Sequence, residues 1–456
     1  MRTAVSTQAP TLNLGYILLI SAVAACGGFL FGYDTAVVSG AIDFLTKQFH
    51  LSAELTGWAA SSLLVGCMAG AVLGGPMGDR FGRKPSLVFC AALFAASSVV
   101  SALPHALAPF AWARFAGGVA IGAASMLSPL YIAEISPEKI RGTLVALYQL
   151  AIVVGILVVF FVNLQIQRLG DETWNTTTGW RWMFASLALP SILFGLFMAV
   201  MPESPRWLMK MGRRSEAQRI LERVGGVETA AREIAQIEQA LHEEQGRWSE
   251  LFTTGYRRAL VIGILLAVFG QFSGINSIMY YAPVIFKAAG AGTDSAFAQT
   301  VIVGAVNLLF TFVAIWLVDR AGRKPLLIVG TIVQVISLTS IGFMFQTART
   351  GSFLLVSILG FVAAFVIAMG PIPWIVNSEI FPTKLRGRAM SVAIFCLWFA
   401  DWIVTQTFPM LRNSIGPACT FWVYAFFSLL STVFVLLMVP ETKGRTLEEI
   451  EASWRK

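Results

Sequence analysis

Long apolar stretches separated by short polar ones make up most of this chain. A helix that crosses a bilayer needs about 20 mainly apolar residues, and we find twelve stretches of about that length. The pattern therefore predicts an all-α membrane protein with twelve transmembrane helices. The expected spans are residues 15–39, 55–75, 85–104, 107–131, 143–164, 180–201, 258–285, 297–318, 325–346, 353–376, 388–412 and 417–439.

Composition agrees, since 56% of the 456 residues are hydrophobic and 13% are charged. The net charge of +8 raises the question of whether the chain binds nucleic acid. Most of the 33 Lys and Arg residues, however, fall in the N-terminus, the even-numbered loops and the C-terminus. This asymmetry is typical of cytoplasmic loops and predicts that both termini are cytoplasmic. The basic excess therefore reflects membrane topology, and we expect no nucleic acid partner.

The chain repeats itself. The motif at residues 79–85 recurs at 319–325, that at 134–142 recurs at 379–387, and Pro-Glu at 202–203 recurs at 440–441. Three motifs that repeat at nearly the same offset predict two homologous six-helix halves. Transporters built in this way bind their substrate near the membrane midplane, between the halves. The expected parts are an N-terminal half (1–201), a cytoplasmic linker (202–257), a C-terminal half (258–439) and a cytoplasmic tail (440–456).

The linker is the one long polar segment. Helical spacing of apolar residues at 214–224 and 229–244 predicts short amphipathic helices against the bundle or the membrane surface. A passive tether is the alternative.

Asp34 lies in an otherwise uncharged run, residues 12–42. A carboxylate near the middle of a membrane span costs about 2.5–3.5 kcal/mol on insertion scales, and such residues usually face a protein interior or a water-filled path. Asp34 is therefore a functional candidate. The alternative is a position at the outer end of the span, in contact with headgroups.

The sequence gives little support for a disulfide framework, a metal site or an enzyme active site. The five cysteines fall within expected spans without CxxC spacing, the three histidines fall in loops, and no Walker-type glycine loop or Ser/His/Asp group is present. The N-terminus carries no pattern of a cleaved signal peptide. We expect no metal, no cofactor and no enzymatic activity.

The repeated motifs place acids and arginines at the cytoplasmic ends of helices, where opposite charges can join neighbouring helices in one conformational state and separate in another. They are gating candidates, with ordinary Gly- and Pro-containing loops as the alternative. The residues are Asp79, Arg83, Glu134, Arg141, Asp319, Arg323, Glu379 and Arg386.

Together with Gly179-Trp180-Arg181, residues 202–207 and residues 440–444, these motifs make the chain resemble a sugar porter of the major facilitator superfamily. The similarity is greatest to bacterial proton symporters of xylose and glucose. It implies a cell inner membrane protein that imports a monosaccharide with protons by alternating access. We expect a monomer whose partners are the sugar, protons and the lipid bilayer. The alternatives are a uniporter, an efflux transporter or a non-transporting sugar receptor.

The resemblance also implies a sugar site. Primary amides both donate and accept hydrogen bonds, as sugar hydroxyls do, and aromatic rings cover apolar sugar faces. The amides implied are Gln149, Gln271, Asn276 and Asn307. Packing between helices is the alternative role for the last three and for Tyr280, and a place at the membrane interface is the alternative for Trp374 and Trp398. The aromatic positions implied are Phe31, Tyr280, Trp374 and Trp398, with Gly370 in the helix-breaking run before Trp374.

Three amides common in similar symporters are replaced, by Ile156, Gly270 and Leu397, which predicts altered sugar choice. Asp401 stands where an amide is common. Binding a hydroxyl, titrating and facing water all remain open for it.

In similar symporters an acid at the position of Asp34 pairs with an arginine at the position of Arg114 and couples protons to transport. Burial favours a neutral carboxyl and a nearby Arg favours a charged one, so a change in their separation changes proton binding. A static ion pair is the alternative.

Overall fold

The computed structural model describes residues 12–137, 140–242, 248–252, 254–348, 351–381 and 383–443. The predicted C-terminal tail is thus described only to Lys443, and residues 1–11 lie outside the described part.

Helices make up the described chain, and twelve segments within it are long and apolar enough to cross a membrane, which confirms the predicted all-α architecture. In the N-terminal half the helices are α1 (Leu14–Ala36), α2 (Val38–Gln48), α3 (Ala53–Phe81), α4 (Arg83–Ala102), α5 (Leu107–Ile135), α6 (Arg141–Gln167), α7 (Glu172–Trp174), the π-helix η2 (Asn175–Gly179), α8 (Trp180–Ala185) and α9 (Ala188–Val200). In the C-terminal half they are α12 (Thr254–Phe272), α13 (Ile275–Ala288), α14 (Thr293–Ala321), α15 (Arg323–Gln346), α16 (Ser352–Ile367), α17 (Ile372–Ile380), α18 (Thr383–Ser414) and α19 (Gly416–Met438).

The duplicated glycines explain two matching turns. Gly82 (φ 101°) separates α3 from α4, and Gly322 (φ 91°) separates α14 from α15. A positive φ is readily adopted by glycine alone, so both repeats of the motif stop one helix and start the next. A further glycine, Gly274 (φ 82°), breaks the seventh span into α12 and α13.

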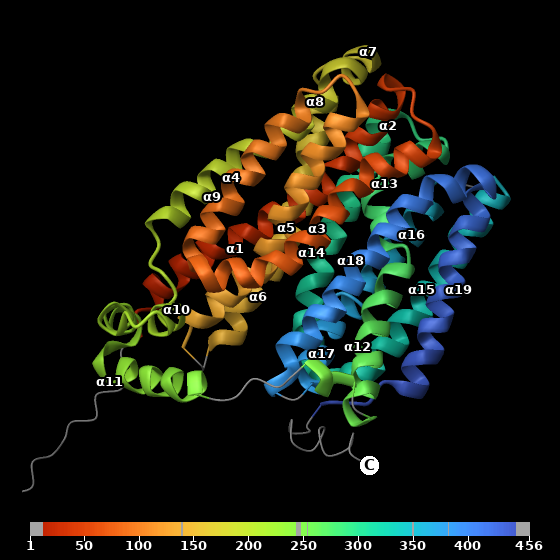
Figure 1. The fold of residues 1–456 in the computed structure, drawn as a ribbon. Coiled ribbons are helices and arrows are strands. Elements are labelled where there is room, and N and C mark those ends of the chain that lie inside the picture. Colours follow the sequence, from red (N-terminus) through yellow and green to blue (C-terminus); the bar gives the residue numbers. More distant parts are fainter. Residues whose placement is uncertain are drawn as a thin grey trace, which may run out of the picture.

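Helices of the N-terminal half pack closely where glycines face a neighbouring backbone. A Cβ on Gly32 of α1 would lie 1.9 Å from the carbonyl oxygen of Ile152 on α6, and one on Gly118 of α5 would lie 1.9 Å from that of Leu63 on α3. These glycines allow the backbones to touch, as small residues do in membrane helix pairs. Between the halves, α18 packs on α3, α14 on α6 and α13 on α2 (Figure 1).

The linker contains α10 (Pro205–Lys210), α11 (Arg214–His242) and the 3₁₀ helix η3 (Trp248–Phe252). Gly226 (φ 78°) breaks α11, close to the gap between the two predicted amphipathic helices. Leu221, Ala230 and Ile234 are buried in one cluster, as the predicted apolar stripe requires. The backbone N–H of Asn13, which precedes α1, donates to the carbonyl of Val224 at 3.0 Å.

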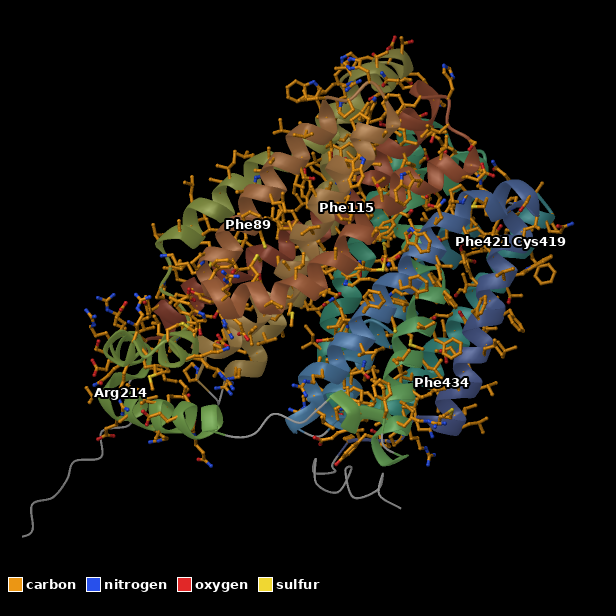
Figure 2. All side chains as sticks on the ribbon, viewed as in Figure 1. Phe89, Phe115, Arg214, Cys419, Phe421 and Phe434 are labelled. Atoms are coloured by element: carbon orange, nitrogen blue, oxygen red, sulfur yellow. The ribbon has the colours of Figure 1, made fainter. Side chains whose placement is uncertain are left out.

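We call the end of the bundle that carries α10 and α11 the linker end, and the opposite end, with α2 and α7, the distal end (Figure 1). Charged side chains gather around α11, where Arg214 is labelled, while carbon-rich side chains cover the sides of the bundle (Figure 2). Phe89 on α4, for example, is 56% exposed. Exposed apolar sides are what a bilayer-embedded bundle presents to lipid.

Candidate transport site

Asp34 and Arg114 form a buried pair at the centre of the N-terminal half. Both are about 1% exposed, and Nη1 of Arg114 binds Oδ1 of Asp34. Nη2 of Arg114 donates to the Asp34 backbone carbonyl at 2.8 Å. The predicted neighbours are thus in contact, and the guanidinium also lies 5.0 Å from the ring centroid of Phe184.

Local structure explains this geometry. Asp34 lies in the last turn of α1, where helix carbonyls have no partner further along the helix, so its carbonyl is available to Arg114. Oδ2 of Asp34 has no hydrogen-bond partner among the described residues. A Cβ on Gly117 of α5 would lie 3.0 Å from this oxygen. Gly117, which sequence reasoning missed, therefore leaves space beside the free oxygen.

Asp401 on α18 is also 1% exposed. Its Oδ1 accepts a hydrogen bond from Thr405 Oγ1 at 3.1 Å. Asn276 and Tyr280 of α13 lie beside it, and Tyr280 also lies beside Thr35 of α1. Asp401 therefore belongs to the interface between the halves.

The predicted amides are only partly brought together. Nδ2 of Asn276 donates to Oε1 of Gln271 at 2.8 Å across the α12–α13 break. Asn307 is buried on α14, at 6% exposure. Gln149 is exposed on α6. Neither Gln149 nor Asn307 makes a side-chain hydrogen bond that joins it to the other amides in the described structure.

Some of the predicted aromatic residues also come together, while others lie apart. Phe31 of α1 and Trp398 of α18 face each other across the halves, with ring centroids 5.5 Å apart, and Tyr280 is buried nearby. Trp374 is 40% exposed and lines a small recess with Leu397 and Asn377. Gly370 lies in the break between α16 and α17, where its N–H donates to the Phe365 carbonyl at 2.9 Å.

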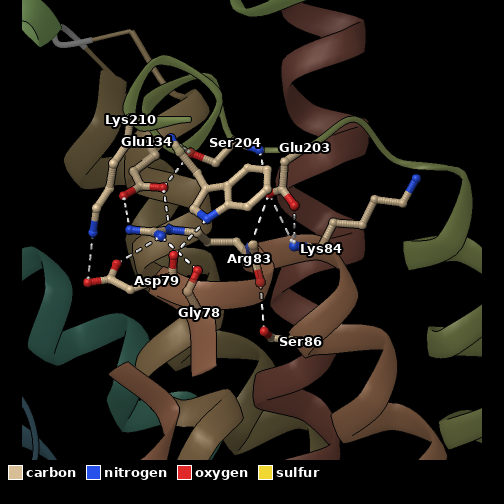
Figure 3. Close-up of polar contacts among 11 residues, drawn as sticks. Gly78, Asp79, Arg83, Lys84, Ser86, Glu134, Glu203, Ser204 and Lys210 are labelled. Atoms are coloured by element: carbon tan, nitrogen blue, oxygen red, sulfur yellow. Dashed lines mark hydrogen bonds and ion pairs between the residues drawn. The ribbon is translucent and has the colours of Figure 1, made fainter. Parts of the chain in front are cut away.

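Four predicted gating residues lie in the N-terminal half at the linker end, and three of them meet. Arg83 binds both carboxylate oxygens of Glu134 at 3.0 Å and Asp79 at 3.1 Å (Figure 3). Lys210 of α10 reaches Asp79 at 3.1 Å, which fastens the linker to this cluster. Arg141 takes no part, because its guanidinium donates to the Ser136 carbonyl at 3.3 Å.

The C-terminal half repeats the arrangement in a simpler form. Arg323 lies 3.1 Å from Glu379. Arg386 makes no ion pair with the described residues, and the side chain of Asp319 lies outside them. The described gating charges thus join helices within each half.

Two glutamates of the repeated Pro-Glu motif have a role that sequence reasoning missed. Glu203 accepts hydrogen bonds from the backbone N–H groups of Arg83 and Lys84 at 3.1 and 3.2 Å. Glu441 does the same for Arg323 and Lys324 at 3.2 and 3.1 Å. Each carboxylate therefore occupies a helix N-terminus, where unpaired N–H groups favour negative charge.

Their environments differ. Burial raises the pKa of Glu203 above its usual value, although N–H donors act against it. Burial acts on Glu441 too, but N–H donors from Lys443, Arg323 and Lys324 outweigh it and lower its pKa. The sequence carried one sign of this role of Glu203 and Glu441, because a Pro-Glu motif that is repeated in both halves indicates a function common to both.

At the distal end, charges connect the two halves. Arg168, which follows α6, binds both oxygens of Asp294 on α14, at 2.6 and 3.0 Å. Lys287 of α13 lies 2.8 Å from Asp43 of α2. Ser61 and Gln406 add a hydrogen bond of 2.8 Å between α3 and α18. These contacts hold the distal ends together.

Comparison with known proteins shows which family and which relatives this chain is similar to. The model of the "Sugar (and other) transporter" family matches residues 20–454. The arabinose-proton symporter of Bacillus subtilis is 47% identical, over 97% of this chain and 96% of its own length. The D-xylose-proton symporter of Escherichia coli is 42% identical over the same shares.

Solved structures agree. The inward open conformation of the E. coli xylose transporter matches with a TM-score of 0.88 and 40% identity, over 96% of this chain and all of that one. The proton:xylose symporter bound to 6-bromo-6-deoxy-D-glucose matches with a TM-score of 0.80 and 42% identity, over 97% of this chain and all of that one.

Proposed function

Because this chain belongs to the sugar transporter family, we propose that it carries a monosaccharide across the membrane together with protons. Relatives named as proton symporters of arabinose, xylose and galactose support this function. A pentose is the expected substrate, since the relatives at 47% and 42% identity are named for arabinose and xylose.

The observation that carries the proton-coupled function is the buried pair of Asp34 and Arg114. Arg114 favours the charged carboxylate, whereas burial favours the neutral acid. A movement between α1 and α5 therefore changes the affinity of Asp34 for a proton. The unpartnered Oδ2 of Asp34 is the atom that would accept the proton in this conformation.

For the sugar, Gln271 and Asn276 supply donors and acceptors at the break between α12 and α13, and Phe31 and Trp398 supply apolar faces. Gln149, Asn307, Tyr280, Trp374 and Gly370 are the further positions assigned to the sugar path. Exposure of Gln149 leaves its amide accessible to a ligand. Transport by this site needs no covalent chemistry and no cofactor.

The transport cycle alternates between two states. In the state described, polar contacts join the halves at the distal end, which supports a site closed on that side and reached from the linker end. The linker end faces the cytoplasm, by the charge asymmetry, and both termini are cytoplasmic. The protein acts as a monomer in the cell inner membrane.

The test is transport by purified protein in liposomes. Labelled arabinose, xylose, galactose and myo-inositol are offered with and without an imposed pH gradient. We expect Asp34→Asn to exchange sugar across the membrane but to lose accumulation driven by the pH gradient. Asp171→Asn, an exposed change at the start of α7, is the control and should accumulate sugar as the parent does.

Two outcomes would count against the proposal. Accumulation that survives in Asp34→Asn would remove Asp34 from proton coupling. A parent protein that equilibrates sugar but never accumulates it would be a uniporter.

A further inference from the structure

The bundle buries two carboxyl groups near its centre, and only one of them has a cation. Asp34 binds Arg114 through its side chain and its carbonyl. Asp401 is buried to the same degree, and its hydrogen-bonding neighbours are the neutral side chains of Thr405, at 3.1 Å, Asn276 and Tyr280. Its Oδ2 has no hydrogen-bond partner within the described chain.

The groups that face Asp401 are neutral. Asn276 and Tyr280 of α13 lie beside it, and Cys67 of α3 lies within electrostatic range. Tyr280 and Cys67 are the titratable groups that face it from the neighbouring helices, and no lysine or arginine among the described residues contacts it. A buried charge without a partner costs several kcal/mol, and ionisable groups so placed usually become neutral. Asp401 is therefore a candidate for a carboxyl group that binds a proton.

Asp401 is also connected to Asp34 across the interface between the halves. Tyr280 lies beside both Asp401 and Thr35, the residue that follows Asp34. Cys67 lies within electrostatic range of Asp34, Arg114 and Asp401. Asp34 and Asp401 thus lie in one buried region, but Arg114 binds Asp34 and not Asp401.

A third connection leads to the amides. Asn276 donates one N–H to Gln271 at 2.8 Å and lies against Asp401. A ligand hydroxyl that engages these amides must rearrange hydrogen bonds shared with Asp401. Binding of such a ligand and protonation of Asp401 are therefore linked, whatever happens at Asp34.

We propose that Asp401 is a second proton-binding group of the transporter, which makes sugar affinity depend on pH independently of the pair of Asp34 and Arg114. The proposal rests on the proposed function for its ligand, a monosaccharide. It departs from that function in placing a proton site in the C-terminal half.

The test uses equilibrium sugar binding, which needs no gradient. Purified parent, Asp401→Asn, Asp401→Glu and Asp34→Asn are titrated with xylose and arabinose between about pH 6 and pH 9. Once Asp401 ionises, affinity in the parent should fall by up to about tenfold per pH unit, as linkage to one proton requires. Asp401→Asn should bind with affinity nearly constant over this range, whereas Asp401→Glu and Asp34→Asn should keep a pH dependence.

Infrared spectra supply a second readout, since a protonated buried carboxyl gives its own C=O band. The band should be present in the parent, persist in Asp34→Asn and vanish in Asp401→Asn. Absence of the band from the parent overturns the proposal even if no Asp401 variant folds. An unchanged pH dependence in a folded Asp401→Asn protein overturns it too. Loss of proton-driven accumulation in the liposome assay tests Asp34 alone, so the two proposals fail separately.

Discussion

The charged contacts at the distal end should stabilise the described state over its opposite. Arg168 with Asp294, and Lys287 with Asp43, each join one half to the other, so neither pair survives if the distal ends separate. We expect Arg168→Gln combined with Lys287→Met to shift the protein toward the distal-open state.

The size of the shift follows from exposure. Arg168 and Asp294 are 48% and 57% exposed, so water and salt screen their attraction and this pair contributes little. Lys287 and Asp43, at 19% and 25%, are better shielded and should contribute about 1 kcal/mol. The double change should therefore alter the ratio of the two states by a factor of about 5.

Distances between spin labels on α2 and α14 at the distal end measure this ratio. The control is Arg213→Gln, which removes the contact of Arg213 with Glu216. That pair has two bonds of 2.7 Å and an exposure of 50% and 40%, but it lies within the linker. High salt should imitate the double change, since it screens exposed charges. Equal distance distributions in parent and double variant would refute the reasoning.

Three further predictions test other parts of the molecule. Gln149→Ala or Gln271→Ala should weaken sugar binding by about 1–3 kcal/mol through lost or unpaired hydrogen bonds, measured by titration in detergent, and unchanged affinity in both would dismiss them as ligands. Arg141→Ala or Glu379→Ala should favour opening of the linker end, because the predicted gate joins the halves through these charges in the opposite state, and the opening is seen as longer distances between labels on the two halves. Glu441→Gln should lower the melting temperature at neutral pH but not in acid. Because the folded pKa of Glu441 is lowered, its ionised form adds stability above the unfolded pKa, and this is lost as pH falls through the folded pKa.

The spans were predictable because bilayer thickness fixes the length of an apolar helix. The breaks inside the first and seventh spans were not, although the helix-breaking run at Gly370 marked the break between α16 and α17. The first span continues beyond the predicted residue 39 to Gln48, after a new helix starts at Val38. The seventh breaks at Gly274. Hydropathy is nearly continuous through both places, so it carries no sign of a change in backbone direction.

Which residues belong to the site was easier to predict than which of them contact one another. An uncharged run singled out Asp34 on physical grounds, and resemblance to the family supplied Arg114 as its partner. Glu134 and Arg141 share one motif, but Glu134 of α5 binds Arg83, the first residue of α4, because α4 packs against α5. Sequence spacing reports neighbours along one helix, whereas ion pairs in a bundle depend on which helices meet.

The two halves share the charges predicted to act in gating but not their buried charges. Arg83 with Glu134 and Arg323 with Glu379 are repeats of one design, as expected if both halves perform the same movement. The buried charges break this symmetry, since the N-terminal half pairs Asp34 with Arg114 while the C-terminal half buries Asp401 without a cation. A rocking movement requires similar contacts in both halves. Coupling that movement to a proton gradient requires a group whose charge changes during the cycle. The movement thus requires both repeats alike, whereas the proposed proton binding requires only single acids, which explains why the buried charges differ between the halves.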